Sequence, residues 1–105
     1  MAEPTVRATR YEVSCLPEGH DLAHSMTINV EYRGRDRYAV VNRLNEALGT
    51  DGEWDWEPRP SERGDDWLAT HRFDLDTALR LAKEAAPKLT VKGRTAAEWL
   101  AEDPS

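Results

Sequence analysis

The sequence contains few of the residues that usually fill a protein core. Leucine, isoleucine, valine and phenylalanine make up only 18 of the 105 residues. Such a composition with a large net charge is typical of disorder, but the net charge here is a moderate −6. Four tryptophans and three tyrosines supply further apolar surface. A folded core therefore requires the tryptophans, and we expect Trp54 and Trp56 to be buried.

Cysteine and long apolar runs are also scarce. The only cysteine is Cys15, so no disulfide can form within the chain. No run of apolar residues reaches even ten, which excludes a transmembrane helix. The N-terminal MAEPTVRATR lacks the apolar segment of a secretory signal. These features predict a cytoplasmic protein without a membrane partner.

Motifs of the common catalytic sites are missing. The sequence has no G-x-S-x-G, H-E-x-x-H, Walker loop or G-x-G-x-x-G pattern. Paired carboxylates are so abundant that no single pair is informative. His71 falls on the apolar face of an expected strand, where a structural role is commoner than a role as a base. We therefore expect a protein that is not an enzyme and needs no cofactor.

Alternating apolar and polar residues predict several short strands. The chain has the length of one domain, with residues 1–6 as a flexible tail and residues 7–105 as the domain. Residues 38–48 fit either a strand or a helix ending at Gly49, and we prefer a strand through Asn42 because Tyr38 and two valines favour it. The strands are expected at residues 10–15, 27–32, 37–42, 53–57 and 67–73.

Two helices are expected after the strands. Asp74 is a suitable N-cap for LDTALRLAKEAA, whose apolar residues recur at helical spacing. Thr95 and Glu98 match a capping box for a short helix that buries Trp99, and we expect Trp99 to contact Leu81. The predicted fold is α+β: an antiparallel four- to five-stranded meander packed by one long helix and a short C-terminal helix.

The chain resembles two groups of proteins. Its strands followed by FDLDTAL resemble the layout of small sheet-plus-helix DNA-binding domains of the plant-transcription-factor and integrase arm-binding type. The segments VEYRGRDRYAV, GTDGEWDWEPRPSER and WLATHRFDLDTALRLAKEAAP look like parts of small uncharacterised proteins of actinobacteria and their phages, over roughly residues 10–93. The first resemblance implies a sheet face that docks on DNA, and the second implies a phage or mobile-element origin without a known activity.

Acidic residues are concentrated in one part of the chain. Residues 46–76 carry ten acidic and three basic side chains. In a strand at EWDWE, the tryptophans share one face and the acids the other. Our main hypothesis is a non-enzymatic accessory protein that docks on an unidentified protein partner through this acidic surface, and open sheet edges make a homodimer plausible. The expected partner-binding residues are Glu53, Asp55, Glu57, Asp65 and Asp66.

Arginines on an expected hairpin provide an alternative hypothesis. Guanidinium groups offer paired donors to phosphate, and a β-ribbon can enter a DNA groove. The residues of this nucleic-acid alternative are Arg33, Arg35, Arg37 and Arg43. The acidic remainder of the chain disfavours general nucleic-acid binding. We therefore favour a solvated turn in which these arginines pair with the acids of residues 46–66 within the chain.

A metal-stabilised domain is the third hypothesis. Cys15, His20 and His24 have a C-x4-H-x3-H spacing, and zinc favours thiolate and imidazole ligands. Cys15, however, falls on the apolar face of its expected strand, and free cysteines are usually buried. We therefore favour a buried Cys15 with solvent-facing histidines and assign no metal ligands.

Overall fold

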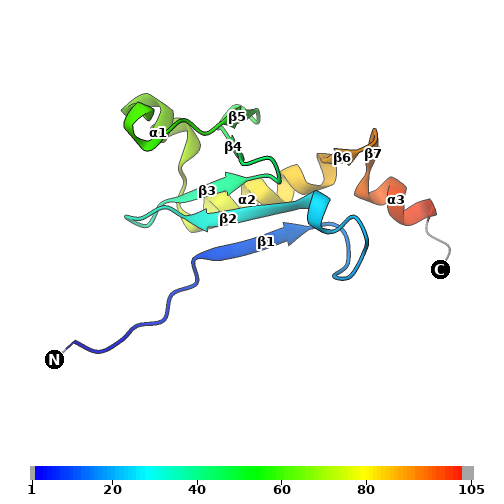
Figure 1. Cartoon of the computed structure of the whole chain (residues 1–105), viewed down its shortest axis with the longest axis horizontal. Helices are drawn as coiled ribbons and strands as arrows, with labels where there is room; N and C mark the ends of the chain where they lie inside the picture. The colour runs from blue at the N-terminus through cyan, green and yellow to red at the C-terminus, as the bar shows by residue number, and fades with distance from the viewer. Residues whose placement is uncertain (1, 103–105) are drawn as a thin grey trace.

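The central feature of the fold is an antiparallel sheet in which each strand pairs with the next one along the chain. The computed structural model describes residues 2–102. The order of the strands is β1-β2-β3-β4-β5, which confirms the predicted meander (Figure 1). The strands are β1 (Arg10–Ser14), β2 (Thr27–Tyr32), β3 (Tyr38–Val41), β4 (Glu46–Leu48) and β5 (Trp54–Trp56).

The turn between β2 and β3 has an unusual backbone for its sequence. The amide of Arg37 donates to the carbonyl of Gly34 at 2.9 Å, and Arg35 and Asp36 have φ angles of 54° and 58°. Two successive positive φ values define a type I′ turn, where Asn-Gly is the preferred pair. Arginine and aspartate carry a Cβ that opposes this conformation, so the turn is held against local preference.

A second tight turn explains how residues 38–48 fold. The side-chain oxygen of Asn42 accepts hydrogen bonds from the amides of Leu44 and Glu46, at 2.9 and 3.0 Å. Asn45 has a φ of 62°, a left-handed conformation that asparagine tolerates. The segment is therefore two strands around a turn. The preferred strand through this region is confirmed up to Val41, and the helical alternative is wrong.

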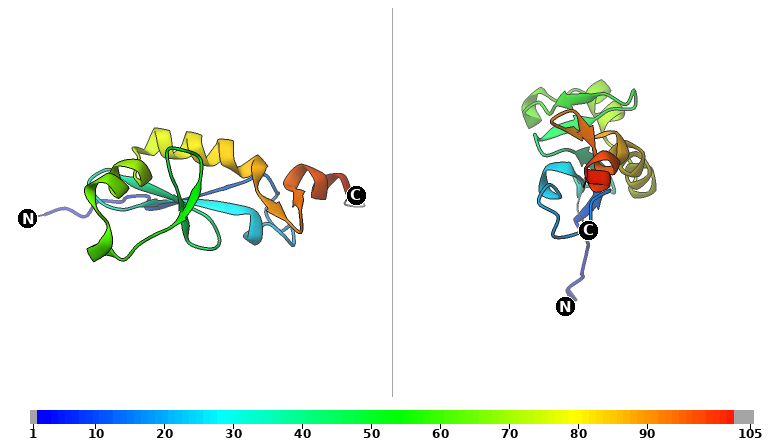
Figure 2. Two further views of the ribbon diagram at one scale, coloured as in Figure 1. Left: turned by 90° about the horizontal axis from the view of Figure 1, so that it is seen from above. Right: turned by 90° about the vertical axis from the view of Figure 1, so that its right-hand side faces the viewer.

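Helix α2 (Leu75–Ala85) covers one face of the sheet and continues into a short 3-10 helix, Ala86–Lys88 (Figure 2). Asp74 occupies the predicted N-cap position, and a hydrogen bond with the side chain of Thr77 lowers the pKa of Asp74. The buried stripe of α2 is formed by alanines, which allow the helix to approach the sheet closely. The buried core comprises Ile28, Val30, Val40, Leu48, Phe73, Ala78, Ala82 and Ala86.

Helix α1 (Asp65–His71) replaces the strand that we expected at residues 67–73. Asp65 and Asp66 lie in its first turn, where acids stabilise a helix, and Trp67 and His71 share a face at i and i+4 spacing. Only the end of the segment is extended. There Phe73 exchanges two backbone hydrogen bonds with Tyr38, at 2.7 and 3.0 Å, beside the part of β3 that β4 does not reach.

The opposite face of the sheet has a smaller apolar cluster. Ala39, Val41 and Ala47 are buried there, and the indole of Trp67 packs on them. Helix α1 thus covers β3 and β4 on the side away from α2. This contact gives a seven-residue helix the tertiary support that an isolated helix of that length lacks.

The C-terminal part confirms the predicted capping box. A small hairpin, β6 (Thr90–Val91) and β7 (Arg94–Thr95), leads into α3 (Ala96–Glu102). The amide of Thr95 donates to Oε1 of Glu98 at 3.1 Å, and the amide of Glu98 donates to Oγ1 of Thr95 at 3.4 Å. Trp99 packs with Leu16 and Met26 in a separate cluster, whereas Leu81 packs on the main core, so the predicted Leu81–Trp99 contact is wrong.

The two tryptophans of β5 have different environments. Trp54 is half-buried against the main core, opposite Leu48 in the register. Trp56 is 72% exposed, so its predicted burial is wrong. Helix α2 packs mainly on β1, β2 and β3, so the indole of Trp56, at the end of the edge strand β5, lies outside the face that α2 covers.

Replacing the two tryptophans separately tests this difference. We expect Trp54→Ala to lower the free energy of unfolding by about 2 kcal/mol, because it removes indole contacts with the core. The matched variant Trp56→Ala should change it by less than about 0.5 kcal/mol, as for an exposed residue. Urea titrations followed by circular dichroism measure both values. Equal losses would contradict the assigned environments.

The capping box predicts a pH effect. The hydrogen bond from the Thr95 amide, with a further one from its hydroxyl, lowers the pKa of Glu98. A carboxyl whose pKa is lower when folded adds stability above its unfolded pKa, and this contribution disappears as the pH falls through the folded value. Thr95→Ala keeps the amide donor and removes only the hydroxyl, so it should raise the pKa of Glu98 part of the way back to its ordinary value in an NMR titration. The pKa of Asp74 should stay unchanged as the internal control.

Candidate anion-binding site

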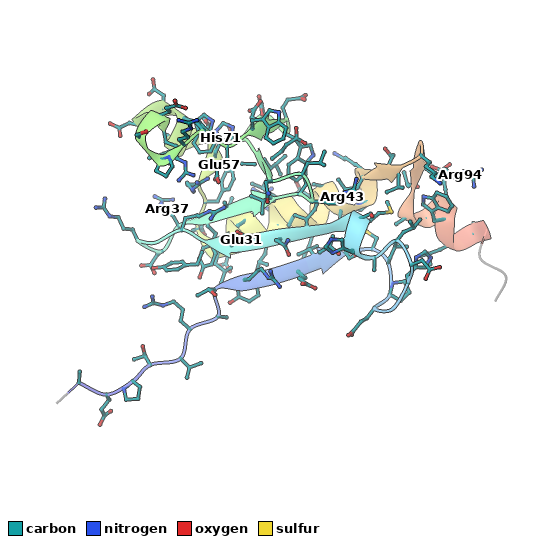
Figure 3. The ribbon with its side chains drawn as sticks, in the orientation of Figure 1. Glu31, Arg37, Arg43, Glu57, His71 and Arg94 are labelled. Atoms are coloured by element: carbon teal, nitrogen blue, oxygen red, sulfur yellow. The ribbon has the colours of Figure 1, made fainter. Side chains whose placement is uncertain are left out.

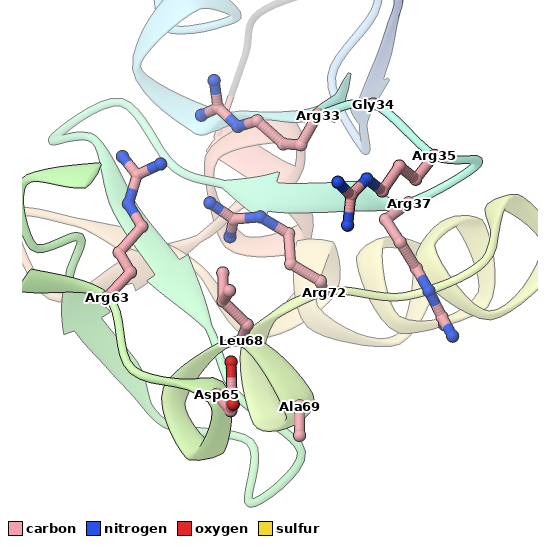
Figure 4. Close-up of a pocket in the computed structure, with 9 residues that line it drawn as sticks. All are labelled: Arg33, Gly34, Arg35, Arg37, Arg63, Asp65, Leu68, Ala69 and Arg72. Atoms are coloured by element: carbon pink, nitrogen blue, oxygen red, sulfur yellow. The ribbon is translucent and has the colours of Figure 1, made fainter. Parts of the chain in front are cut away.

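Five arginines surround a pocket between the β2–β3 turn and helix α1. The pocket has a volume of about 570 Å³, a usual size for a small-molecule site. One wall comes from the turn, and the other comes from α1 and the residues on either side of it (Figure 4). The lining residues are Arg33, Gly34, Arg35, Arg37, Arg63, Asp65, Leu68, Ala69 and Arg72.

Glu57 holds three of these arginines together. Its Oε2 lies 3.3 Å from Nη2 of Arg33 and 3.4 Å from Nη2 of Arg63, and its Oε1 accepts a hydrogen bond from Arg72. The Glu57 side chain is only 14% exposed. Arg63 is fixed further by a 2.8 Å bond from its Nε to the carbonyl of Pro58. One carboxylate therefore positions three guanidinium groups that come from separate parts of the chain.

Arg72 is the buried member of this cluster. Its side chain is 7% exposed, and burial lowers its pKa, whereas the hydrogen bond to Glu57 acts in the opposite direction. Its guanidinium carbon lies 5.1 Å from the ring centroid of Trp67, and Nη1 donates to the carbonyl of His71 at 3.0 Å. The ion pair and the cation–π contact offset the cost of removing this charge from water.

His71 fixes the other side of helix α1. Its ring stacks on Trp67 with centroids 4.2 Å apart, and its Nε2 lies 3.0 Å from Oδ2 of Asp55. Its Nδ1 lies 2.8 Å from the carbonyl oxygen of Trp67. A Cβ at Gly49 would lie 3.1 Å from Nε2 of His71, so the absence of a side chain at Gly49 allows this close approach. The acids of the β5 region thus bind the end of α1.

The predicted acidic residues fall into two groups. Asp55 and Glu57 face α1, where they contact His71 and Arg72. Glu53, Asp65 and Asp66 are exposed, and about half of the Asp55 side chain is exposed as well. Asp65 lines the arginine pocket from the start of α1. The structure therefore does not bring the five residues together on a single outward-facing strip.

The predicted arginines also separate. Arg33, Arg35 and Arg37 all line the pocket, and among the described residues Arg35 and Arg37 form no ion pair. Arg43 lies toward the other end of the sheet, away from Arg37 and Glu57, and donates to the Ser25 hydroxyl at 3.2 Å (Figure 3). Figure 4 shows Arg35 pointing toward Arg72, whereas Arg37 points away from it.

Sequence reasoning missed Arg63 and Arg72 as members of the site. Both are among the three basic residues of the acid-rich segment 46–76. The scarcity of basic residues in this segment could have indicated them, because an arginine among many acids is expected to form ion pairs with its neighbours. The position of Arg72 could not be predicted from the expected strand at residues 67–73. Because α1 ends at His71, the Arg72 side chain points in a different direction from the one that a strand would give it.

The thiol and imidazoles of the predicted metal hypothesis do not form a cluster. Across residues 2–102, no group of three or more His, Cys, Asp or Glu side chains is arranged to hold a metal ion. Cys15 is exposed, so its predicted burial is wrong: β1 ends at Ser14, and the amide of Leu16 turns back to Oγ of Ser14 at 3.1 Å. Leu16, one residue later, takes the buried position.

Removing the central carboxylate tests the cluster. We expect Glu57→Ala to lower the free energy of unfolding by about 3 kcal/mol, because the buried charge of Arg72 would lose its partner. Glu31 pairs with Arg33 at 3.4 Å but is more exposed, so Glu31→Ala serves as the control and should cost less than about 1 kcal/mol. Urea denaturation measures both. A loss no larger for Glu57→Ala than for the control would show that the cluster contributes little.

Comparisons with known proteins give no further assignment. No family model matches the sequence, and neither a curated protein nor a solved structure matches it. Within residues 2–102, none of the helices has both the length and the apolar composition that crossing a membrane requires. The arginine pocket is therefore the feature of the molecule from which a function can be inferred.

Proposed function

We propose that this chain is a non-enzymatic nucleic-acid-binding protein that contacts phosphate through the arginine pocket. The observation that carries the proposal is the gathering of five arginines around one concavity. Guanidinium groups bind phosphate oxygens through paired donors, and they remain charged at all physiological pH values. Arg35 and Arg37 are exposed, so they meet a ligand without first being uncovered.

The strained turn supports the same function. Arg35 has a left-handed φ of 54° at a position where glycine or asparagine would fold more easily. Unfavourable backbone conformations occur often at binding sites, where they place a side chain that the function requires. The conformation of the turn places Arg35 at the rim of the pocket, facing Arg72 (Figure 4).

The net charge of −6 limits how the protein binds. Most non-specific affinity for nucleic acid comes from phosphate neutralisation, so an acidic molecule binds weakly except where its basic groups are concentrated. Contact is therefore confined to the end of the molecule that carries the β2–β3 turn. The proposal includes a cytoplasmic location, consistent with a single cysteine.

A second candidate is docking of a basic protein partner on an acidic surface, as we first expected. The exposure of Glu53, Asp65 and Asp66 favours it. Asp55 and Glu57 contribute less, because they already contact His71 and Arg72. Pairing of two copies through an edge strand also remains a proposal, supported by the positions of β1 and β5 at the sheet edges.

Fluorescence anisotropy with a labelled oligonucleotide at low salt tests the proposal. We expect binding that weakens steeply as salt is added, because bound phosphates release counterions. Arg35→Ala combined with Arg37→Ala should weaken binding and reduce the slope of log affinity against log salt by about 1 to 2.

Arg43→Ala is the matched control, since it removes an exposed arginine outside the pocket. It should leave most of the affinity intact. No binding at low salt would reject the nucleic-acid proposal and favour the acidic docking surface. Equal losses from both variants would show that net charge, and not the pocket, determines binding.

A further inference from the structure

We propose that the arginine pocket selects a terminal phosphate monoester over the internal phosphodiesters of a nucleic acid. This inference rests on the proposed function and specifies the part of the ligand that enters the site. It follows from the charge of the pocket, from its size and from its apolar floor.

The charge of the pocket favours a phosphate monoester. Its lining carries five arginines and one carboxylate, Asp65. Glu57 and Glu31 do not line it but pair with its arginines. When these two carboxylates are included, the pocket keeps a positive excess, although one of its five arginines, Arg37, points away from Arg72 (Figure 4). A phosphate monoester carries about −1.5 to −2 at pH 7, whereas an internal diester carries one negative charge, so a positive pocket attracts the monoester more strongly.

The arrangement of donors favours the same ligand. Glu57 has two oxygens and holds three arginines, so the more exposed Arg33 and Arg63 retain donors that Glu57 does not use. Arg35 faces this cluster from the turn (Figure 4). A terminal phosphate presents three oxygens to such donors, whereas a diester presents two, because its other two oxygens continue the chain.

The size of the pocket provides the third argument. A volume of about 570 Å³ suits one small ligand, whereas a polynucleotide backbone that passes through a site needs an extended groove. The β2–β3 turn stands on one side and α1 on the other. Leu68 and Ala69 supply apolar contacts beyond the guanidinium groups, where the sugar or base of an end nucleotide would lie.

Oligonucleotides of one sequence that differ only at their ends test this inference. The probes are an unphosphorylated strand, a 5′-phosphorylated strand and a 3′-phosphorylated strand, measured by anisotropy at fixed salt. We expect one phosphorylated strand to bind at least tenfold more tightly than the unphosphorylated strand. If all three affinities agree within twofold, selection of a monoester is refuted, while nucleic-acid binding itself stands.

The same phosphate group could come from a free nucleotide. Isothermal titration with a nucleoside monophosphate, compared with its nucleoside, separates the two sources. Tight binding of the monophosphate but of none of the strands would keep the monoester selectivity and reject nucleic acid as the ligand. Failure of the proposed function and failure of the further inference therefore give different results.

A variant links the selectivity to the pocket. Arg35→Gln changes an exposed residue that forms no ion pair among the described residues, so the fold should persist, as circular dichroism can verify. We expect the affinity ratio between phosphorylated and unphosphorylated strands to fall below about threefold. The control Arg43→Gln should retain the full ratio. A ratio unchanged in Arg35→Gln would place the selectivity outside this pocket and overturn the inference.

Discussion

The ion pair between Glu57 and Arg72 is the interaction on which the functional end of the molecule depends. Arg72 is nearly inaccessible to water, and an unpaired guanidinium at such a depth would be very costly. Its pairing fixes the residue that follows α1 and therefore the end of that helix. The same carboxylate orders Arg33 and Arg63, which belong to the opposing hairpin and to the loop before α1. The carboxylate of Glu57 thus stabilises the end of α1 and also positions the arginines of the pocket.

This arrangement gives part of the acid-rich segment a structural role within the chain. Alternating acids on an edge strand have the appearance of a surface for a basic partner. Here two of them, Asp55 and Glu57, instead bind basic groups of their own chain. The acids thereby keep a positive pocket assembled inside a negatively charged molecule. Net charge alone would have directed attention away from the basic site.

The parts of the fold that could be predicted are those set by local sequence. The alternation in TINVEY and the spacing of apolar residues in α2 specify a strand and a helix directly, and the Thr95–Glu98 pair is a local capping signal. Helix α1 could not be predicted in this way. Its seven residues fit both the helical and the strand spacing of apolar residues. The helix is selected by contacts of this segment with Asp55, Glu57 and the sheet. The exposure of Trp56 could not be predicted for a related reason: it depends on which strands α2 covers, and α2 packs mainly on β1, β2 and β3.

The site was predictable only in part, because some of its residues are brought together by tertiary contacts and not by local sequence. The arginines of the turn are close together in sequence, so their clustering was visible. Arg63 and Arg72 reach the pocket only through the path of α1, which no local pattern specifies. Arg43 was grouped with the others because it is near them in sequence, yet the turn at Asn42 directs it toward Ser25.

The short pairing between β3 and β4 has a consequence for the pocket. These strands are joined in the ladder through Val41 and Ala47, with one further hydrogen bond from Asn42 to Glu46. One wall of the pocket belongs to the β2–β3 hairpin and the other to the segment beyond this junction. The two walls are also joined directly, because Phe73, the residue after Arg72, exchanges two backbone hydrogen bonds with Tyr38 of β3. The spacing of the two walls is thus fixed by this backbone bridge as well as by the ion pairs of Glu57, so a ligand enters a pocket that is already formed.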